Sequence, residues 1–242
     1  MRFIVMHKLD KHSEAGLPPT RELMAAVGKL IAEGAASGVF LSGEGLQPSS
    51  TRTRLSFSSG HCTRTEGPYS GSNELIAWFA MIQVKSKDEA VDWGRRLGEV
   101  MGDVDIEVGQ VKDPWHLGVC PEPEDAPMRF LLLRKAGAAS MSPEQLAGLE
   151  KLTEEMTKAG VFLLAERLQP SSQGARLRSS GGKRSVIDGP FAESKELIGG
   201  YAIIRVNSKA EAIEWASGFA QVLSSANTEG LVEMDILPLH QI

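Results

Sequence analysis

An internal repeat spans most of the 242-residue chain. The stretch GVFLSGEGLQPSS at 38–50 recurs as GVFLLAERLQPSS at 160–172, a shift of 122 residues, and about half of the aligned positions from 38 to 93 are identical. The start MRFIVMHK at 1–8 likewise matches MRFLLLRK at 128–135. A repeat of this period predicts two copies of one structural unit. We therefore expect domains at 1–111 and 128–242, joined by an extended linker at 112–127 that is rich in proline and acidic residues.

Each copy shows the same order of secondary-structure patterns. Short apolar runs bounded by turn residues predict strands, and apolar residues at helical spacing predict two helices in each copy. Ser142, Ser86 and Ser208 stand where they would cap the start of a helix. The expected strands are 2–8, 39–46, 75–85 and 104–111 in the first copy and 129–135, 161–168, 197–207 and 231–237 in the second, with a polar hairpin inserted before the third strand of each copy. This order predicts an α+β fold of two tandem ferredoxin-like, split βαβ units.

One strand limits how the two units assemble. The run LIAWFAMIQV at 75–84 is apolar at both alternating sets of positions, and such a strand is buried on both faces of its sheet. The helices of a split βαβ unit cover only one face. We therefore expect the sheets of the two copies to pack against each other, so that one chain forms for itself what a single-copy relative forms by dimerisation.

Composition excludes several classes of function. The net charge of −5 is distributed without basic runs, which argues against nucleic acid as a partner. No apolar run approaches the length that spans a membrane, so we expect a cytoplasmic protein without membrane contact. Cys62 and Cys120 lack metal-type spacing and are expected to be two unrelated reduced thiols. There is no phosphate loop, dinucleotide fingerprint, nucleophile elbow or metal spacing, so we expect no bound cofactor and no metal.

The second copy carries a nine-residue motif, DGPFAESKE at 188–196, followed by LIGGY at 197–201, and the first copy carries GEGLQP at 43–48. In these residues the chain resembles the YCII-related family, in the branch marked by an Asp-Gly-Pro-Phe motif, and the resemblance covers nearly all of both copies. The resemblance implies a ferredoxin-like α+β fold that pairs into a dimeric α/β barrel. Here that pairing is expected within one chain.

The residues of the motif have two interpretations. Asp188 stands at a turn, where its carboxylate can accept hydrogen bonds from nearby backbone N–H groups. Alternatively, the clustering of Asp188, Glu193, Lys195 and Glu196 within nine residues places carboxylates beside an ammonium group, which can tune a pKa for proton transfer.

Comparison of the copies indicates one pocket. In the first copy Asp188 is replaced by Glu66, Glu193 by Gly71 and Lys195 by Asn73, and the pair Gly199-Gly200 is replaced by Ala77-Trp78. Glycine inside a strand marks a bulge or the close approach of another group, whereas tryptophan fills such a space. The copies therefore predict a working pocket beside Gly199 and Gly200 and a scaffold role for the first copy, with drift in a packing detail as the alternative.

Further polar residues recur at equivalent positions. Glu44 and Glu166 lie in otherwise apolar strands, where a carboxylate is exposed, paired or functional. Pairing with His7 or Arg134 is the structural explanation. The functional prediction places Asp188, Glu166 and Arg134 together as catalytic residues. The predicted substrate-binding residues are Gly199, Gly200, Tyr201, Glu193, Lys195, Gln169 and Ser171.

Some YCII-related proteins are thought to use a histidine and an aspartate as a catalytic pair, and the resemblance places that histidine in the first helix. The corresponding stretches, TRELMAAV at 20–27 and SPEQLAGL at 142–149, contain no histidine, so a His-Asp mechanism is not carried over to this chain. The sequence predicts a small-molecule-binding protein, either without catalysis or as a cofactor-free acid-base catalyst of elimination, isomerisation or hydrolysis. The alternative is a non-catalytic interaction or regulatory module, and the resemblance to the YCII-related family implies that such a module is linked to an extracytoplasmic-function sigma factor. The intrachain pair is expected to be a monomer or to form a homodimer.

Overall fold

The structure is a computed structural model that describes the chain except residues 72–73, 137–140, 182, 192–196, 227–230 and 242. Its strands are β1 (Arg2–Lys8), β2 (Phe40–Gly45), β3 (Thr53–Ser58), β4 (His61–Glu66), β5 (Ile76–Val84), β6 (Val104–Gln110), β7 (Met128–Lys135), β8 (Phe162–Arg167), β9 (Ala175–Ser180), β10 (Lys183–Asp188), β11 (Ile198–Arg205) and β12 (Leu231–Pro238). The helices are α1 (Lys11–Glu14), α2 (Arg21–Ala36), α3 (Lys87–Met101), α4 (Pro143–Lys158) and α5 (Lys209–Ala226), with short 3₁₀ turns η1 (Ser49–Thr51), η2 (Pro114–Leu117) and η3 (Ser171–Gln173).

The helix starts agree with the sequence. The hydroxyl groups of Ser86, Ser142 and Ser208 accept hydrogen bonds from backbone N–H groups three residues further on, and Ser142 forms a full capping box with Gln145. These contacts satisfy N–H groups that have no partner within the helix. The predicted α+β class and the predicted order of elements are confirmed.

The two sequence copies do not form one sheet each. One six-stranded antiparallel sheet, called sheet A here, has the strand order β10-β9-β12-β1-β11-β2, and the other, sheet B, has the order β4-β3-β6-β7-β5-β8. Sheet A therefore combines β1 and β2 of the first copy with four strands of the second copy, and sheet B has the reverse composition. The expectation of tandem units with one sheet per copy is corrected, because β1 pairs with β11 and β12 rather than with strands of its own copy.

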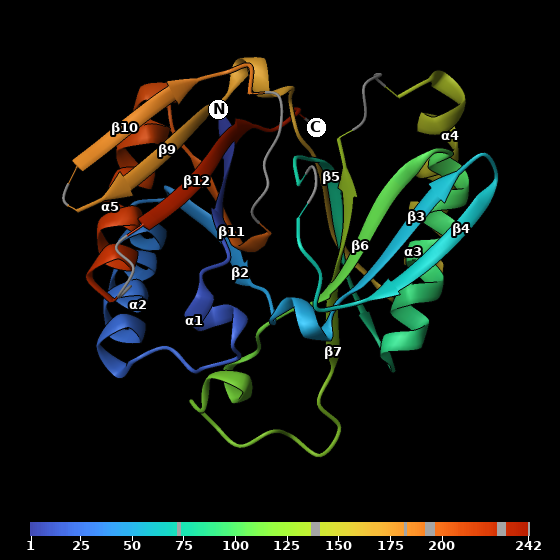
Figure 1. Ribbon diagram of the computed structural model, residues 1–242, viewed down its shortest axis with the longest axis horizontal. Coiled ribbons are helices and arrows are strands. Elements are labelled where there is room, and N and C mark those ends of the chain that lie inside the picture. Colours follow the sequence, from blue (N-terminus) through green and yellow to red (C-terminus); the bar gives the residue numbers. More distant parts are fainter. Residues whose placement is uncertain (72–73, 137–140, 182, 192–196, 227–230, 242) are drawn as a thin grey trace.

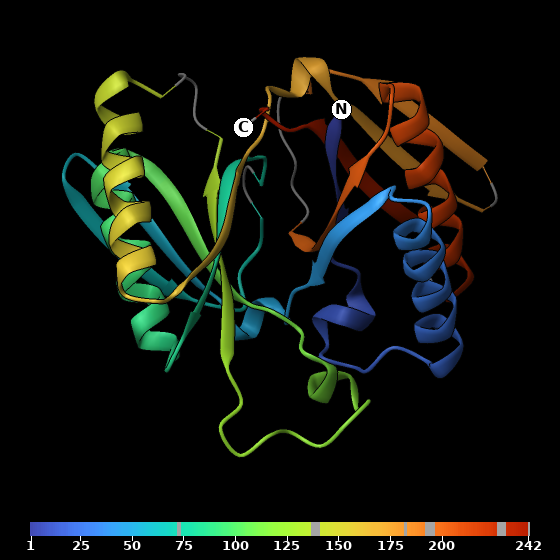
Figure 2. The same ribbon diagram turned by 180° about the vertical axis from the view of Figure 1, so that it is seen from behind.

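The molecule has four layers, with one pair of helices on the outer face of each sheet (Figures 1 and 2). Helices α2 and α5 cover sheet A, and α3 and α4 cover sheet B. Each pair contains one helix from each copy, because α2 follows the exchanged strand β1 and α4 follows the exchanged strand β7. The strand exchange therefore extends to a complete β-α-β segment of each copy.

The inner faces of the two sheets are buried against each other. A cluster of buried apolar residues joins Ile4 and Ile203 of sheet A to Met81 and Leu131 of sheet B. The ring of Phe79 in β5 lies 4.9 Å, centroid to centroid, from the ring of Tyr201 in β11. Separate apolar clusters lie between each sheet and its helices. Both faces of β5 are thus covered, as its apolar pattern predicts.

Two ion pairs related by the repeat connect the sheets at their rims. Arg129 of β7 binds Glu44 of β2, with 2.6 Å between Nη1 and Oε1, and Arg2 of β1 binds Glu166 of β8. The prediction that Glu44 and Glu166 pair with His7 or Arg134 is wrong. Their partners lie on the facing sheet, at the starts of the exchanged strands.

Charged residues also form buried clusters within each sheet. In sheet B, Glu107 binds Arg52, Arg54 and Lys135 at distances of 2.9, 3.2 and 3.1 Å. At the equivalent place in sheet A, Asp235 binds Lys8 and Arg176, each at 2.6 Å. Burial raises the pKa of the Asp235 carboxyl, but the neighbouring cations outweigh burial and hold it below its ordinary value. These clusters fix the pairing of β1 with β12 and of β7 with β6.

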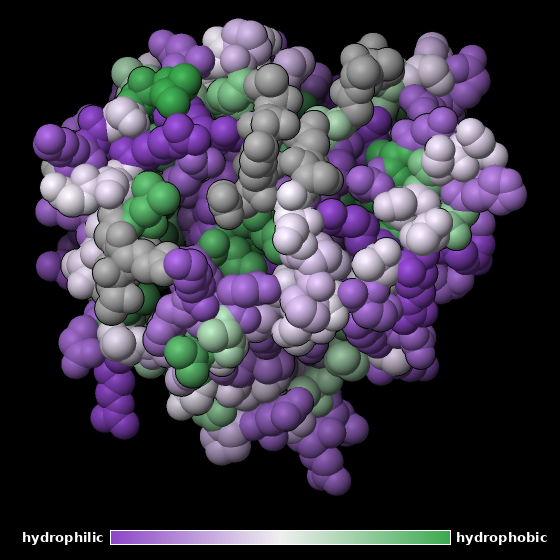
Figure 3. Space-filling model, in the orientation of Figure 1, coloured by the Kyte–Doolittle hydropathy of each residue, from purple (hydrophilic) through white to green (hydrophobic). Residues whose placement is uncertain are grey.

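On the face seen in Figure 3, hydrophilic residues predominate and hydrophobic ones lie in separate small areas. The apolar surfaces of the two sheets are accordingly inside the molecule, between the layers, rather than on this face.

We expect the chain to stay assembled after the linker is cut. A protease site introduced at the exposed residues 120–124 should give two fragments that elute together at the mass of the intact chain, because each fragment supplies two strands to the sheet of the other. Size-exclusion chromatography with light scattering measures this. Fragments that separate, each folded and monomeric, would contradict the strand exchange.

Candidate functional site

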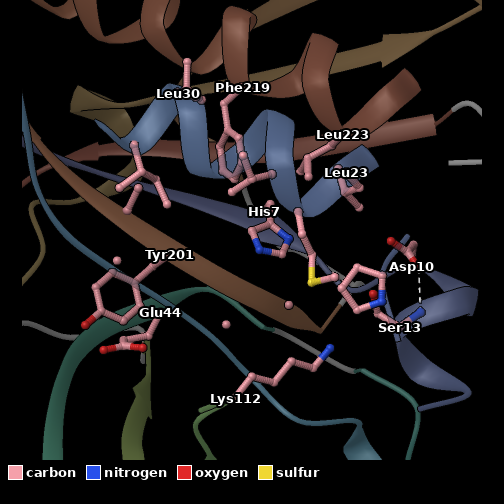
Figure 4. A pocket seen from close by; sticks show the side chains of 18 of the residues that line it. His7, Asp10, Ser13, Leu23, Leu30, Glu44, Lys112, Tyr201, Phe219 and Leu223 are labelled. Carbon is pink, nitrogen blue, oxygen red and sulfur yellow. Dashed lines mark hydrogen bonds between the residues drawn. The ribbon is translucent and has the colours of Figure 1, made fainter. Parts of the chain in front are cut away.

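A cavity of about 500 Å³ lies between the outer face of sheet A and helices α2 and α5. This volume is within the range of small-molecule sites. Most of the lining is apolar, and Figure 4 shows His7 between apolar side chains of α2 and α5 on one side and Glu44, Tyr201 and Lys112 on the other. The apolar side chains include Leu23, Val27, Leu30, Phe40, Trp215, Phe219 and Leu223.

The cavity exists because the two halves of the molecule differ at equivalent positions. Three side chains of α4, which packs on sheet B, are buried: Leu149, Leu152 and Met156. In α2, which packs on sheet A, Gly34 is the only buried residue. Sheet B also has Trp78, only 3 % exposed, at the position equivalent to Gly200 of sheet A. A large side chain thus fills the space in one half that is open in the other.

The glycine pair makes room for an imidazole. His7 in β1 is paired with Gly200 in β11. A Cβ atom on Gly199 would lie 2.7 Å from Cε1 of His7, and a Cβ on Gly200 would lie 2.7 Å from Nε2 of His7 and 2.6 Å from the carbonyl oxygen of Glu44. These distances are too short for any side chain. The close approach predicted at these glycines is therefore made by a residue of the first copy, which the strand exchange brings to β11.

His7 is held as a neutral group at the centre of the cavity. Its Nδ1 lies 3.3 Å from the carbonyl oxygen of Lys8, and its ring meets the edge of Phe219 at 5.9 Å between centroids. Burial is the largest influence and lowers the pKa of His7 to about 4. At neutral pH the imidazole is unprotonated. Because Nδ1 donates to the carbonyl, Nε2 is left as the basic nitrogen.

The other polar groups of the cavity come mainly from the first copy and the segment after it. Lys112 follows β6, and its backbone N–H donates to the carbonyl of Gly45 at 2.8 Å. Asp10 caps α1 by accepting from the N–H of Ser13 at 2.7 Å. Tyr201 of the second copy borders the cavity, but its ring packs against Phe79 between the sheets, and burial raises the pKa of its phenol above the ordinary value. Lys112 belongs to the segment predicted to be a linker, so that segment also lines the cavity.

The structure places the three predicted catalytic residues in different surroundings. Asp188, at the end of β10, is exposed and binds Lys209 at 2.6 Å. Glu166 lies on the rim between the sheets, paired with Arg2. Arg134 is buried beside Trp78 in sheet B, and its Nε has no hydrogen-bond partner among the described residues. The expectation that these three side chains form one pocket is corrected, because Asp188 belongs to sheet A and the other two to sheet B.

The predicted substrate-binding residues divide into three groups. Gly199 and Tyr201 line the cavity, and Gly200 contacts the ring of His7. Gln169, which precedes η3, and Ser171, its first residue, lie outside the cavity lining, and the Ser171 hydroxyl donates to the carbonyl of Phe191 at 3.2 Å. The predictions for Glu193 and Lys195 fall outside the described residues.

The Asp-Gly-Pro-Phe motif makes contacts that hold the fold together. A Cβ atom on Gly189 would lie 1.7 Å from the carbonyl oxygen of Ser171, so the position requires glycine. The ring of Phe191 lies under the guanidinium group of Arg176 at 4.5 Å. The first copy repeats these contacts with Gly67 against Ser49 and with Tyr69 under Arg54. Peptide bonds Gly67–Pro68 and Gly189–Pro190 are both cis.

Sequence reasoning missed His7 and Lys112 as residues of the site. The signal for His7 is present in the sequence, because His7 and Arg134 differ at equivalent positions just as Gly200 and Trp78 do. Linking the two differences requires the pairing of β1 with β11, which the sequence does not specify. Lys112 carries no such signal.

Within the described residues, no group of three or more histidine, cysteine, aspartate or glutamate side chains is placed to hold a metal ion. None of the described helices is both long enough and apolar enough to cross a membrane.

Comparison with known proteins agrees with the repeat. The model of the YCII-related domain matches the chain twice, at residues 1–111 and 128–233. The chain belongs to the YCII-related family. An uncharacterised protein of Rhizobium meliloti (strain 1021) is 37 % identical over 94 residues, which cover 38 % of this chain and 73 % of that protein. No solved structure matches the chain.

We expect His7 to stay neutral well below the usual histidine pKa of 6.5 and to titrate near pH 4. Since the unfolded chain binds a proton at higher pH than the folded protein does, His7 makes the free energy of unfolding rise as the pH increases from about 4 to 6.5. His7→Gln should remove that part of the pH dependence. NMR titration of the imidazole, with His7→Gln to assign its signal, measures the pKa, and a value at or above 6.5 would contradict burial of the neutral ring.

Proposed function

We propose that this YCII-related protein binds a small, largely apolar molecule in the cavity between sheet A and helices α2 and α5. The observation that carries this proposal is the difference between the halves. In sheet B the equivalent space is occupied by Trp78 and by the buried side chains of α4, whereas in sheet A the apolar side chains of α2 face a cavity of about 500 Å³. Removing apolar side chains from water lowers the free energy of the system. A bound ligand would bury the apolar side chains of α2 in this way.

In a catalytic form of this function, His7 is the acid-base group. Its unprotonated Nε2 is the basic nitrogen of a ring at the centre of the cavity, and a group with this placement accepts a proton from a bound substrate without any cofactor. Elimination, isomerisation and hydrolysis each include such a step. The predicted roles of Asp188, Glu166 and Arg134 have less support, because these side chains lie apart from the cavity and from one another.

The alternative function, an interaction module linked to an extracytoplasmic-function sigma factor, predicts a filled core beside Gly199 and Gly200. The cavity at this place favours ligand binding.

We also propose that the facing sheets correspond to an intrachain dimeric α/β barrel of ferredoxin-like units, which the inter-sheet apolar cluster supports. We further propose that the protein acts in the cytoplasm.

A substitution that fills the cavity tests the proposal. Val27 lines the cavity from α2, whereas Ala25 of the same helix is exposed and does not line it. We expect the neutral fluorescent probe N-phenyl-1-naphthylamine to bind the wild-type protein and Ala25→Trp equally, and to bind Val27→Trp at least tenfold more weakly. Fluorescence titration gives the Kd values.

The matched control separates loss of space from loss of fold, since both variants place tryptophan on one helix. Circular dichroism of Val27→Trp should match that of the wild-type protein. Equal probe affinity for Val27→Trp and Ala25→Trp would refute the cavity as the binding site, as would the absence of probe binding to the wild-type protein.

A further inference from the structure

Lys112 is positioned by the backbone at the polar end of the cavity. Its N–H donates to Gly45 in β2 at 2.8 Å, and the side chain runs along the cavity lining next to Gly45, which has no side chain of its own. In the other half the equivalent backbone bond joins His240 to Arg167 at 2.9 Å, and there the two side chains contact each other at 3.2 Å. The open place beside Lys112 is therefore specific to the half that contains the cavity.

No ion pair or side-chain hydrogen bond of Lys112 is formed within the described part of the chain. The side chain is half-buried, and burial followed by the nearby charge of Arg52 lowers its pKa, while the charge of Asp10 acts in the opposite direction without reversing the shift. A cation in partly apolar surroundings without a partner carries a desolvation cost. An anion bound at this place offsets that cost.

Two acidic side chains line the cavity among the described residues, Asp10 and Glu44. Glu44 is bound by Arg129 of the facing sheet. Asp10 accepts from the N–H of Ser13 at the start of α1 and keeps its negative charge, but no ion pair joins it to Lys112 within the described part of the chain. The cationic charge of Lys112 is therefore the charge that a ligand in the cavity can complement.

We propose that Lys112 binds the carboxylate of an apolar carboxylic acid, whose hydrocarbon body lies against α2 and α5 beside His7. This inference rests on the proposed function of the cavity and names the class of its ligand. A monoanion fits better than a phosphate ester, because one ammonium group balances one negative charge and phosphate sites use several donors or a bidentate arginine. The hydrocarbon body of the ligand packs against the side chains of Leu23, Phe219 and Leu223, which lie on the same side of the cavity in Figure 4, opposite Lys112.

The experiment measures displacement of N-phenyl-1-naphthylamine by decanoate, 1-decanol, decylamine and decyl phosphate, in the wild-type protein, Lys112→Met and Lys112→Arg. Methionine keeps the length and the apolar stem of lysine and removes its charge. We expect decanoate to bind the wild-type protein at least tenfold more tightly than decanol, decylamine or decyl phosphate. Lys112→Met should lose the tenfold preference over decanol, and Lys112→Arg should retain most of it.

The outcomes separate the ligand class from the cavity itself. If the probe binds and Val27→Trp blocks it, but decanoate and decanol compete equally or Lys112→Met keeps the preference, the carboxylate assignment is overturned and the cavity function stands. Tighter binding of decyl phosphate would likewise replace the carboxylate with a phosphate ligand. If the probe does not bind the wild-type protein, both proposals fail.

Discussion

The two central strands, β5 and β11, are buried on both faces, and this burial determines how the two copies assemble. Strands β5 and β11 are apolar on both sides, and each therefore needs a layer of helices on one face and a second sheet on the other. The chain meets this requirement by duplication, since the second copy supplies the covering sheet. Strand exchange makes assembly of the two sheets cooperative, because neither sheet is complete until strands of both copies are in place. The ion pairs Arg2–Glu166 and Arg129–Glu44 then link the sheets at equivalent places.

Duplication also explains how a cavity can arise in a fold that stays intact. Each buried element exists twice, so one half can keep a filled core while the other changes. Trp78 and the buried face of α4 fill the space in sheet B. In sheet A, glycine at position 200 admits the ring of His7 and leaves α2 above a cavity. The site lies between the copies, because the exchange brings His7 of the first copy against Gly199 and Gly200 of the second.

The sequence predicted what depends on local pattern and on the repeat. These features are the α+β class, the order of elements, the capped helix starts at Ser86, Ser142 and Ser208, and the close approach of another group at Gly200. The sequence could not give the strand exchange, because equivalent strands of the two copies are nearly interchangeable in apolar pattern, and β1 fits either partner on that basis. For the same reason it assigned Arg134 to the pocket and missed His7, which occupies the equivalent position in the other sheet. The acidic motif at 188–196 suggested chemistry by its composition, whereas in its described part, 188–191, the contacts with Ser171, Arg176 and Lys209 are those of a structural turn.

In this duplicated protein one half contains a cavity, for which we propose a ligand, and in the other half the equivalent space is filled. Methyl-labelled NMR tests it most directly, with chemical-shift changes followed on addition of N-phenyl-1-naphthylamine. We expect changes at the methyl groups of Leu23, Val27, Leu30 and Leu223, with those of Leu149, Leu152 and Met156 unchanged. Changes confined to the methyl groups of α4, or spread equally over both halves, would contradict it.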